Sequence, residues 1–427
     1  MVVAITVPLL VILIGLGFPV AVALFLVGWF LVLLATGDYG QANRLLAFTI
    51  DQSLRNYFLS VIPLFVLMGE VFARSGLVDD LFHALVRGLG RFRSGIPLSV
   101  IFGNAIFAAT TGVSVVSASL FGRVAAPVMI RSGTPPEAAT GLIAGSSILG
   151  MLIPPSILMI VYGLLTDQPI GRLFIAGLVP GILVVAVYSV YILLFWKRYS
   201  TTTSIGEVVS SSKNPKKLSG IPGLILSIVL VLGGIYTGFF TVVEAAAVGA
   251  AFAILTGIVT GRISFVNLVE SLVGSLVTTA SIGVIFLAAS FYAKAIALIG
   301  LPSAIQSWLG ELNLDPRLVV LLICMVIFLL GFALDTVSTL TIVIPVVYPV
   351  LTGLGVDLIW FGILAILSAE MGLITPPVGL SVYALKAALP KELGVSLEAV
   401  FKGAVPFLLL LMLVFLVVFA FPGVLRY

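Results

Sequence analysis

The sequence predicts an all-α membrane protein that crosses the bilayer many times, and three observations carry that prediction. Hydrophobic residues make up 61% of the 427 residues and charged residues only 9%, whereas roughly a quarter of a soluble domain is charged. Apolar runs approaching or exceeding the roughly 20 residues that a helical span needs recur along the chain. These runs lack the period-2 alternation of lipid-facing β-strands. Lipid is therefore the solvent over most of the protein's surface.

The apolar runs define the expected helices. In chain order they are 2–35, 60–73, 95–130, 137–165, 173–196, 220–239, 241–260, 276–300, 317–333, 337–353, 357–385 and 403–425. The stretch 95–130 is too long for one span and contains several glycines, and its counterpart 317–353 is interrupted around Gly331 and Asp335. Irregular backbone at membrane depth must be buried in protein or line a watery cavity. We therefore expect two re-entrant helical hairpins, at about 95–130 and 317–353.

Three other segments are not expected to span. Residues 77–93 and 262–275 mix apolar and charged side chains, which is typical of helices that lie along the membrane interface. The least apolar stretch, 197–219, carries five Lys and Arg residues against one acid. The positive-inside rule therefore places this linker in the cytoplasm.

An internal duplication divides the chain at that linker. The sequences GMLIPP at 150–155 and GLITPP at 372–377 lie 222 positions apart (372 − 150), and Pro127 and Pro349 keep the same offset. With 43 Gly and 22 Pro, single matches arise by chance, but the order of hairpin, Pro-Pro helix and final span recurs in register. We therefore expect inverted-topology repeats. The first occupies 1–196, with a broken helix at about 137–165, and the second occupies 220–427, with a broken helix at about 357–385.

Enzyme signatures are absent from the sequence. There is no phosphate-binding GxxxxGK[ST] loop, no HExxH motif and no paired Cys or His spacing, and the chain has one His and one Cys. No cofactor is expected. Without an ATP site on this chain, uphill transport must draw on an ion gradient or on another subunit.

Hydroxyl residues gather at both hairpin tips. The first tip reads NAIFAATTGVSVVSAS (104–119) and the second reads GFALDTVSTLT (331–341). Hydroxyl and carbonyl oxygens suit hard cations such as Na⁺, and helix N-termini at the midplane suit an anionic substrate. Small residues also allow tight helix packing in membranes. For two matching clusters, each followed by a Pro-Pro element, we favour the binding site.

Ionisable residues within apolar sequence are functional candidates by default. Asp335, Glu370 and Glu244 are the acids expected to lie deepest, and Asp335 ranks first because it belongs to a tip. Glu244 is expected to pack within a scaffold of small residues. Arg123 follows the first tip and either faces a carboxylate substrate or reaches the membrane surface.

Long motifs resemble one transporter family. The segments TTGVSVVSASLFG, TGFFTVVEAAAVGA, GFALDTVSTLTIVIPVVYP and FGILAILSAEMGLITPPVGLSVYALK are similar to those of the large membrane subunit of TRAP (tripartite ATP-independent periplasmic) transporters, the DctM-like family. The resemblance covers essentially the whole chain. It implies an ion-transporter-like elevator secondary transporter in the bacterial inner membrane, with inverted repeats and two re-entrant hairpins. It also implies a small four-helix membrane subunit, a periplasmic binding protein and sodium-driven uptake of an organic acid such as a C4-dicarboxylate or sialic acid.

The resemblance also implies roles for particular residues. One Na⁺ is expected near the first tip and first broken helix, at Thr110, Gly112, Ser114, Ser147, Gly150 and Pro154. A second Na⁺ is expected at Asp335, Thr336, Ser338, Gly372 and Thr375. The substrate carboxylate is expected between the tips, against Thr111, Ser114, Ser117, Arg123, Thr336 and Thr339.

Two other transport modes remain as alternatives. The first is a stand-alone Na⁺/anion symporter that needs no binding protein, and the second is a channel whose oxygen-lined tips form a filter. A membrane enzyme ranks last, because the sequence lacks a catalytic constellation.

Overall fold

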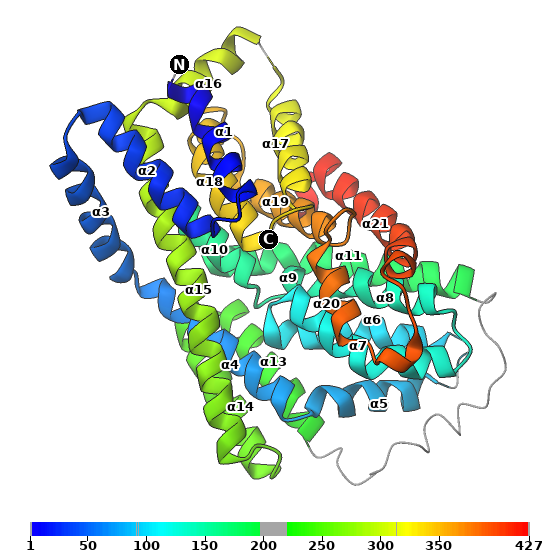
Figure 1. Cartoon of the computed structure of the whole chain (residues 1–427). Coiled ribbons are helices and arrows are strands. Elements are labelled where there is room, and N and C mark those ends of the chain that lie inside the picture. Colours follow the sequence, from blue (N-terminus) through cyan, green and yellow to red (C-terminus); the bar gives the residue numbers. More distant parts are fainter. Residues whose placement is uncertain (1, 91, 93, 197–219, 313, 426–427) are drawn as a thin grey trace.

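Figure 1 shows the computed structural model of the chain, which describes residues 2–90, 92, 94–196, 220–312 and 314–425. Every regular element in these ranges is a helix. The cytoplasmic linker expected at 197–219 lies outside the described residues. The prediction of an all-α protein is confirmed.

The helices follow one another in two series. Before residue 197 they are α1 (Val2–Gly15), α2 (Val20–Thr36), α3 (Tyr39–Leu54), η1 (Tyr57–Ser60), α4 (Val61–Arg74), α5 (Leu77–Leu89), α6 (Gly95–Thr111), α7 (Ser114–Arg131), α8 (Pro136–Ser147), α9 (Leu149–Leu152), α10 (Ile157–Thr166) and α11 (Ile170–Phe195). After residue 219 they are α13 (Ile221–Tyr236), α14 (Val242–Val259), α15 (Phe265–Leu298), α16 (Leu301–Leu312), α17 (Pro316–Leu330), α18 (Thr336–Gly353), α19 (Leu358–Leu373), α20 (Leu380–Ala388), η4 (Lys391–Leu393), α21 (Leu397–Ala420) and η5 (Pro422–Leu425).

Membrane-spanning helices recur along the whole described chain. Seven helices are long and apolar enough to cross a bilayer, and an eighth span results if the bent pair 136–152 and 157–166 crosses as one. Shorter apolar helices, including α6, α17 and α19, accompany them. The prediction of a polytopic membrane protein is therefore confirmed.

Long helices form a scaffold along one side of the molecule. α2 and α4 pack against α15, and α14 packs against α4 and α13 (Figure 1). The prediction of a separate interfacial helix at 262–275 is wrong. Ser264 caps a single helix that runs unbroken for 34 residues to Leu298. The helix continues because this stretch contains no proline.

Each re-entrant hairpin follows an amphipathic helix. α5 precedes the α6–α7 hairpin, and α16 precedes the α17–α18 hairpin. Gly76 and Gly300, with left-handed φ values of 67° and 70°, stand before α5 and α16, a conformation that glycine adopts at little cost. The counterpart of α5 in the second half is therefore α16. The division into two inverted repeats stays a prediction.

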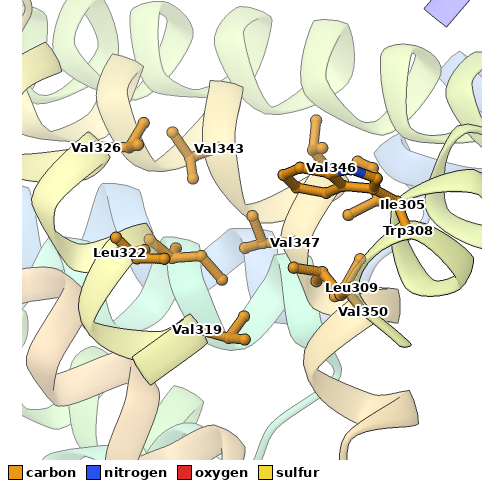
Figure 2. A pocket seen from close by; sticks show the side chains of 11 residues that line it. Ile305, Trp308, Leu309, Val319, Leu322, Val326, Val343, Val346, Val347 and Val350 are labelled. Carbon is orange, nitrogen blue, oxygen red and sulfur yellow. The ribbon is translucent and has the colours of Figure 1, made fainter. Parts of the chain in front are cut away.

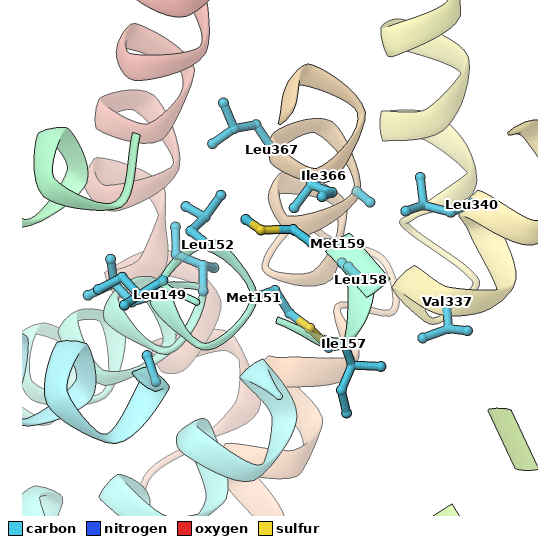
Figure 3. Packing of buried hydrophobic residues seen from close by; sticks show 14 of the residues in the cluster. Leu149, Met151, Leu152, Ile157, Leu158, Met159, Val337, Leu340, Ile366 and Leu367 are labelled. Carbon is cyan, nitrogen blue, oxygen red and sulfur yellow. The ribbon is translucent and has the colours of Figure 1, made fainter. Parts of the chain in front are cut away.

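Both Pro-Pro elements interrupt their helices, as expected. The segments before and after residues 153–156 are bent by 42°, and residues 374–379 separate α19 from α20. Proline lacks the amide proton and clashes with the preceding turn, so the helix cannot continue. Figure 3 shows apolar side chains packed around the first break, with Met151 and Ile157 beside residues of α18 and α19. The first break therefore lies in the apolar core, whereas Pro376 and Pro377 of the second break are exposed.

Candidate functional site

The tip of the first hairpin lies against the first helix break. Gly112 ends α6 with a left-handed φ of 62°, and a Cβ atom there would lie 2.5 Å from the carbonyl oxygen of Pro155. A Cβ atom on Gly150 would lie 2.9 Å from the backbone nitrogen of Ser114. Because real Cβ atoms do not approach so closely, both contacts depend on glycine. The structure thus brings together the two segments expected to hold the first ion.

The second hairpin repeats this arrangement. Its tip, residues 331–335, connects α17 to α18. A Cβ atom on Gly372 would lie 2.6 Å from the Cα atom of Gly331. The backbone of the second tip therefore rests directly on the helix that precedes the second break. The two segments expected to hold the second ion are also adjacent.

The hydroxyl groups at these junctions keep free lone pairs. The Thr110 hydroxyl donates its proton to the backbone oxygen of Phe107 at 2.7 Å. The Thr375 hydroxyl donates to the backbone oxygen of Met371 at 2.7 Å. A hydroxyl oxygen that has donated its proton still has two lone pairs. Such oxygens can coordinate a cation without losing their existing hydrogen bonds.

Asp335 caps the helix that leaves the second tip. Its carboxylate accepts hydrogen bonds from the Ser338 backbone N–H at 3.0 Å and from the Ser338 hydroxyl at 2.5 Å. The Thr339 hydroxyl donates to the backbone oxygen of Asp335 at 2.9 Å. N-cap carboxylates stabilise helices by about 1 kcal/mol. Asp335 thus organises the tip, and its carboxylate remains available there to a cation.

The structure buries the three candidate acids to different extents, and the expected packing of Glu244 is wrong. Asp335 is only half-buried, whereas Glu370 is fully buried, the only charged residue to be so among those whose burial the structure describes. Glu244 does not pack within the scaffold. It is exposed, and its side chain accepts from the backbone N–H of Thr241 at the start of α14. An acid three residues after Thr is a capping-box pattern. Glu244 therefore caps α14 instead of packing among the small residues around it.

Glu370 joins the second broken helix to the first tip. The Ser114 hydroxyl donates to Glu370 Oε2 at 2.6 Å and lies 3.5 Å from the backbone oxygen of Ile148. Sequence reasoning singled out Glu370 as an intramembrane acid but missed this partner. The only sequence feature that points to a role for Glu370 at the site is its position, two residues before Gly372.

A second buried network holds the first hairpin to α8. The Ser117 hydroxyl donates to Asn104 Oδ1 at 2.7 Å, and Asn104 Nδ2 donates to the Ser146 hydroxyl at 2.7 Å. All three side chains are fully buried. The structure therefore directs Ser117, a predicted substrate ligand, toward Asn104 inside the hairpin.

The remaining predicted residues divide into two groups. Thr111, Ser147, Pro154 and Thr336 are buried in or next to the tips and the first break. Arg123 is exposed on α7, nine residues after Ser114, which corresponds to about 13 Å along a helix. It interacts electrostatically with Asp79 on α5. The structure therefore does not bring Arg123 to the tips.

An apolar cavity of about 220 Å³ lies between α16 and the second hairpin. Figure 2 shows its lining, which includes Trp308, Leu322, Val343 and Val347. A carboxylate needs hydrogen-bond donors or positive charge. The lining side chains carry no charge, and the indole N–H of Trp308 is their only donor. This cavity is therefore a poor site for an anionic substrate, and the tip–break junctions remain the candidate site.

Comparisons with known proteins identify the family of the chain. The family model described as the DctM component of the tripartite ATP-independent periplasmic transporter matches residues 7–424. The chain belongs to this family. It is 32% identical over 386 residues to the C4-dicarboxylate TRAP transporter large permease protein DctM of Pseudomonas aeruginosa, covering 89% of this chain and 88% of that protein. It is 27% identical over 409 residues to the sialic acid TRAP transporter large permease protein SiaM of Vibrio cholerae, covering 95% and 93%.

A solved structure supports the fold of this DctM-family chain. The YdaH transporter of Alcanivorax borkumensis matches with a TM-score of 0.67 at 17% sequence identity, over 90% of this chain and 89% of that one. This likeness concerns the fold alone. Family membership makes the chain a transporter permease and not an enzyme, and a multi-pass protein of the inner membrane. The resemblance recognised in the sequence is confirmed.

Proposed function

We propose that this DctM-family permease drives uptake of an organic acid with the sodium gradient. One observation carries the proposal: two tip–break junctions, at Gly150 and Gly372, each combine close backbone contact with hydroxyl oxygens. Hydroxyl and carbonyl oxygens suit a hard cation. Bound Na⁺ would stabilise each tip against its break, because the cation takes ligands from both.

The anionic substrate would lie between the tips. Both α7 and α18 begin there, at Ser114 and Thr336, and helix N-termini carry partial positive charge and free N–H groups. Relatives named for C4-dicarboxylate and sialic acid transport carry carboxylate cargo. An organic acid of that kind is therefore the proposed cargo of this chain.

The proposed movement is an elevator. The helices α2, α4, α14 and α15 would form the fixed scaffold, while the two hairpins and the two broken helices would move together. The amphipathic helices α5 and α16, which precede the hairpins, would connect the fixed and mobile parts. The cross-repeat contacts described above support a mobile part that moves as one body.

The proposed partners are a small four-helix membrane subunit and a periplasmic binding protein. The description of the family as tripartite supports this assembly. The small subunit would extend the scaffold, and the binding protein would deliver the substrate at the periplasmic face.

Uptake into proteoliposomes that contain the assembled transporter tests this function. An inward sodium gradient should drive accumulation of radiolabelled succinate or sialic acid, and replacing Na⁺ with choline should abolish it. Equal accumulation in choline would contradict sodium coupling. Uptake without the binding protein would favour a stand-alone symporter. The absence of counterflow, together with ion conductance, would favour a channel.

A further inference from the structure

The Glu370 carboxylate lies beside the first tip although it belongs to the second half of the chain. It projects from α19 two residues before Gly372, and its Oε2 atom accepts from the Ser114 hydroxyl at 2.6 Å. That hydroxyl oxygen also lies 3.5 Å from the Ile148 backbone oxygen. Hydroxyl, carbonyl and carboxylate oxygens therefore converge at one buried point.

One oxygen of this carboxylate has no partner among the described residues. Glu370 Oε1 is buried without a hydrogen bond, and the side chain is fully buried. The described part of the chain places no Lys, Arg or His side chain in an ion pair with it. A buried carboxylate without a compensating charge costs several kcal/mol. A cation bound there would remove that cost. The structure thus leaves a free ligand oxygen at the first tip, on an acid whose ionised form needs a cation beside it.

The internal repeat explains why the first tip needs this acid. With the offset of 222 positions, Asp335 in the second tip corresponds to Val113 in the first. The first tip, residues 104–119, contains no acid of its own. Glu370 corresponds to Ile148 by the same offset, and both residues contact the Ser114 hydroxyl. The first tip therefore lacks the acid that the second tip has in Asp335, and Glu370 lies at that place.

We propose that Glu370 is a direct ligand, and the negative charge, of the sodium ion at the first tip. The proposal rests on the proposed sodium coupling and names the residue that balances the ion. One turn of α19 then serves both ion sites, because Glu370 reaches the first tip while Gly372 contacts the second. Occupancy of one site would shift this turn and so alter the other site.

A purely structural role is the competing explanation. The first residue of α7 is preceded by Val113, which provides no side-chain cap, and a carboxylate near a helix N-terminus is stabilising. Glu370→Gln distinguishes the two roles. The amide oxygen of glutamine can still accept the hydrogen bond from the Ser114 hydroxyl, whereas the charge that binds a cation is lost.

Sodium-dependent thermal stability of the purified full chain measures the difference. The melting temperature is followed as NaCl replaces choline chloride at constant ionic strength, since a ligand of the folded state raises it by mass action. Glu370→Gln should raise the sodium concentration for half-maximal stabilisation at least tenfold. Glu398→Gln, the same change at an exposed acid of α21, should leave it unchanged.

The outcomes separate this inference from the proposed function. If sodium does not stabilise the unsubstituted chain, sodium coupling itself fails. If sodium stabilises it and Glu370→Gln leaves the half-maximal sodium concentration unchanged, the role of Glu370 is only structural and the inference is overturned. If the glutamine variant does not fold, Glu370→Asp decides, because the shorter side chain withdraws the carboxylate. An unchanged sodium midpoint in that variant overturns the inference equally.

Discussion

The Ser114 hydroxyl donates a hydrogen bond of 2.6 Å to the carboxylate of Glu370, 256 positions away in the sequence. Both side chains are fully buried. A second bridge lies at the start of α19, where the Tyr162 hydroxyl donates to the backbone oxygen of Leu358 at 2.5 Å. These two bonds join α7 and α10 of the first half to α19 of the second. They tie the first hairpin and the first broken helix to the second broken helix.

Thr375→Val should weaken sodium-dependent uptake. The substitution keeps the shape of the side chain but removes the hydroxyl oxygen whose proton is held by Met371. We expect the half-saturating sodium concentration to rise on the order of tenfold, which corresponds to about 1.4 kcal/mol of lost binding. Thr352→Val is the control, because Thr352 makes the same kind of bond on an exposed face of α18. Unchanged sodium dependence of the Thr375 variant in proteoliposomes would count against an ion site there.

Gly372→Ala should damage the second tip–break junction. The new methyl group would lie 2.6 Å from the backbone of Gly331, so one of the two segments must move. Overpacking of this kind costs about 1–3 kcal/mol, and we expect both a lower melting temperature and uptake reduced more than tenfold. Gly283→Ala on α15, where a Cβ atom meets nothing within 4 Å, should be tolerated. Full activity of the Gly372 variant would show that the contact is dispensable.

Asn104→Ala should loosen the first hairpin. The substitution removes the acceptor of Ser117 and the donor to Ser146, and a buried polar group left without a partner costs about 1–3 kcal/mol. The melting temperature in detergent should therefore fall. Asn43→Ala, which removes an exposed bond to Trp29, should change it little. Equal melting temperatures for the two variants would be inconsistent with a structural role of Asn104.

Asp79→Asn should stabilise the protein at alkaline pH. Burial raises the pKa of the Asp79 carboxyl from its ordinary value of 3.8, an effect augmented by Asp80 and opposed by His83 and Arg123. An acid whose pKa is raised by folding destabilises the fold when ionised. That cost is present above the folded-state pKa and disappears as pH falls through it.

The melting temperature of the Asp79→Asn variant should therefore exceed that of the unsubstituted protein at pH 8, and the difference should shrink toward pH 4. Asp80→Asn should act in the opposite direction at pH 8, because it removes the carboxylate of the ion pair with Arg262. A pH-independent difference for Asp79→Asn would contradict the proposed cause.

Much of the candidate site followed from local sequence signals. Glycine beside hydroxyl residues marked both tips, and the Pro-Pro elements marked both breaks, because these residues act on their own backbone. The prediction of a separate helix at 262–275 was wrong for a related reason. Charged residues suggested an interfacial segment, but without a chain breaker the helix continued through them as α15.

The amino-acid sequence by itself determined that this protein spans the membrane, where its helices break and which hydroxyl residues stand at the breaks. Hydropathy and the backbone restrictions of glycine and proline are local properties, so they can be read along the chain. Only the tertiary structure decided which acid lies buried at the first tip. The burial of Glu370 depends on how α19 packs against α9 and α17, and its bond to Ser114 joins residues that no local pattern relates.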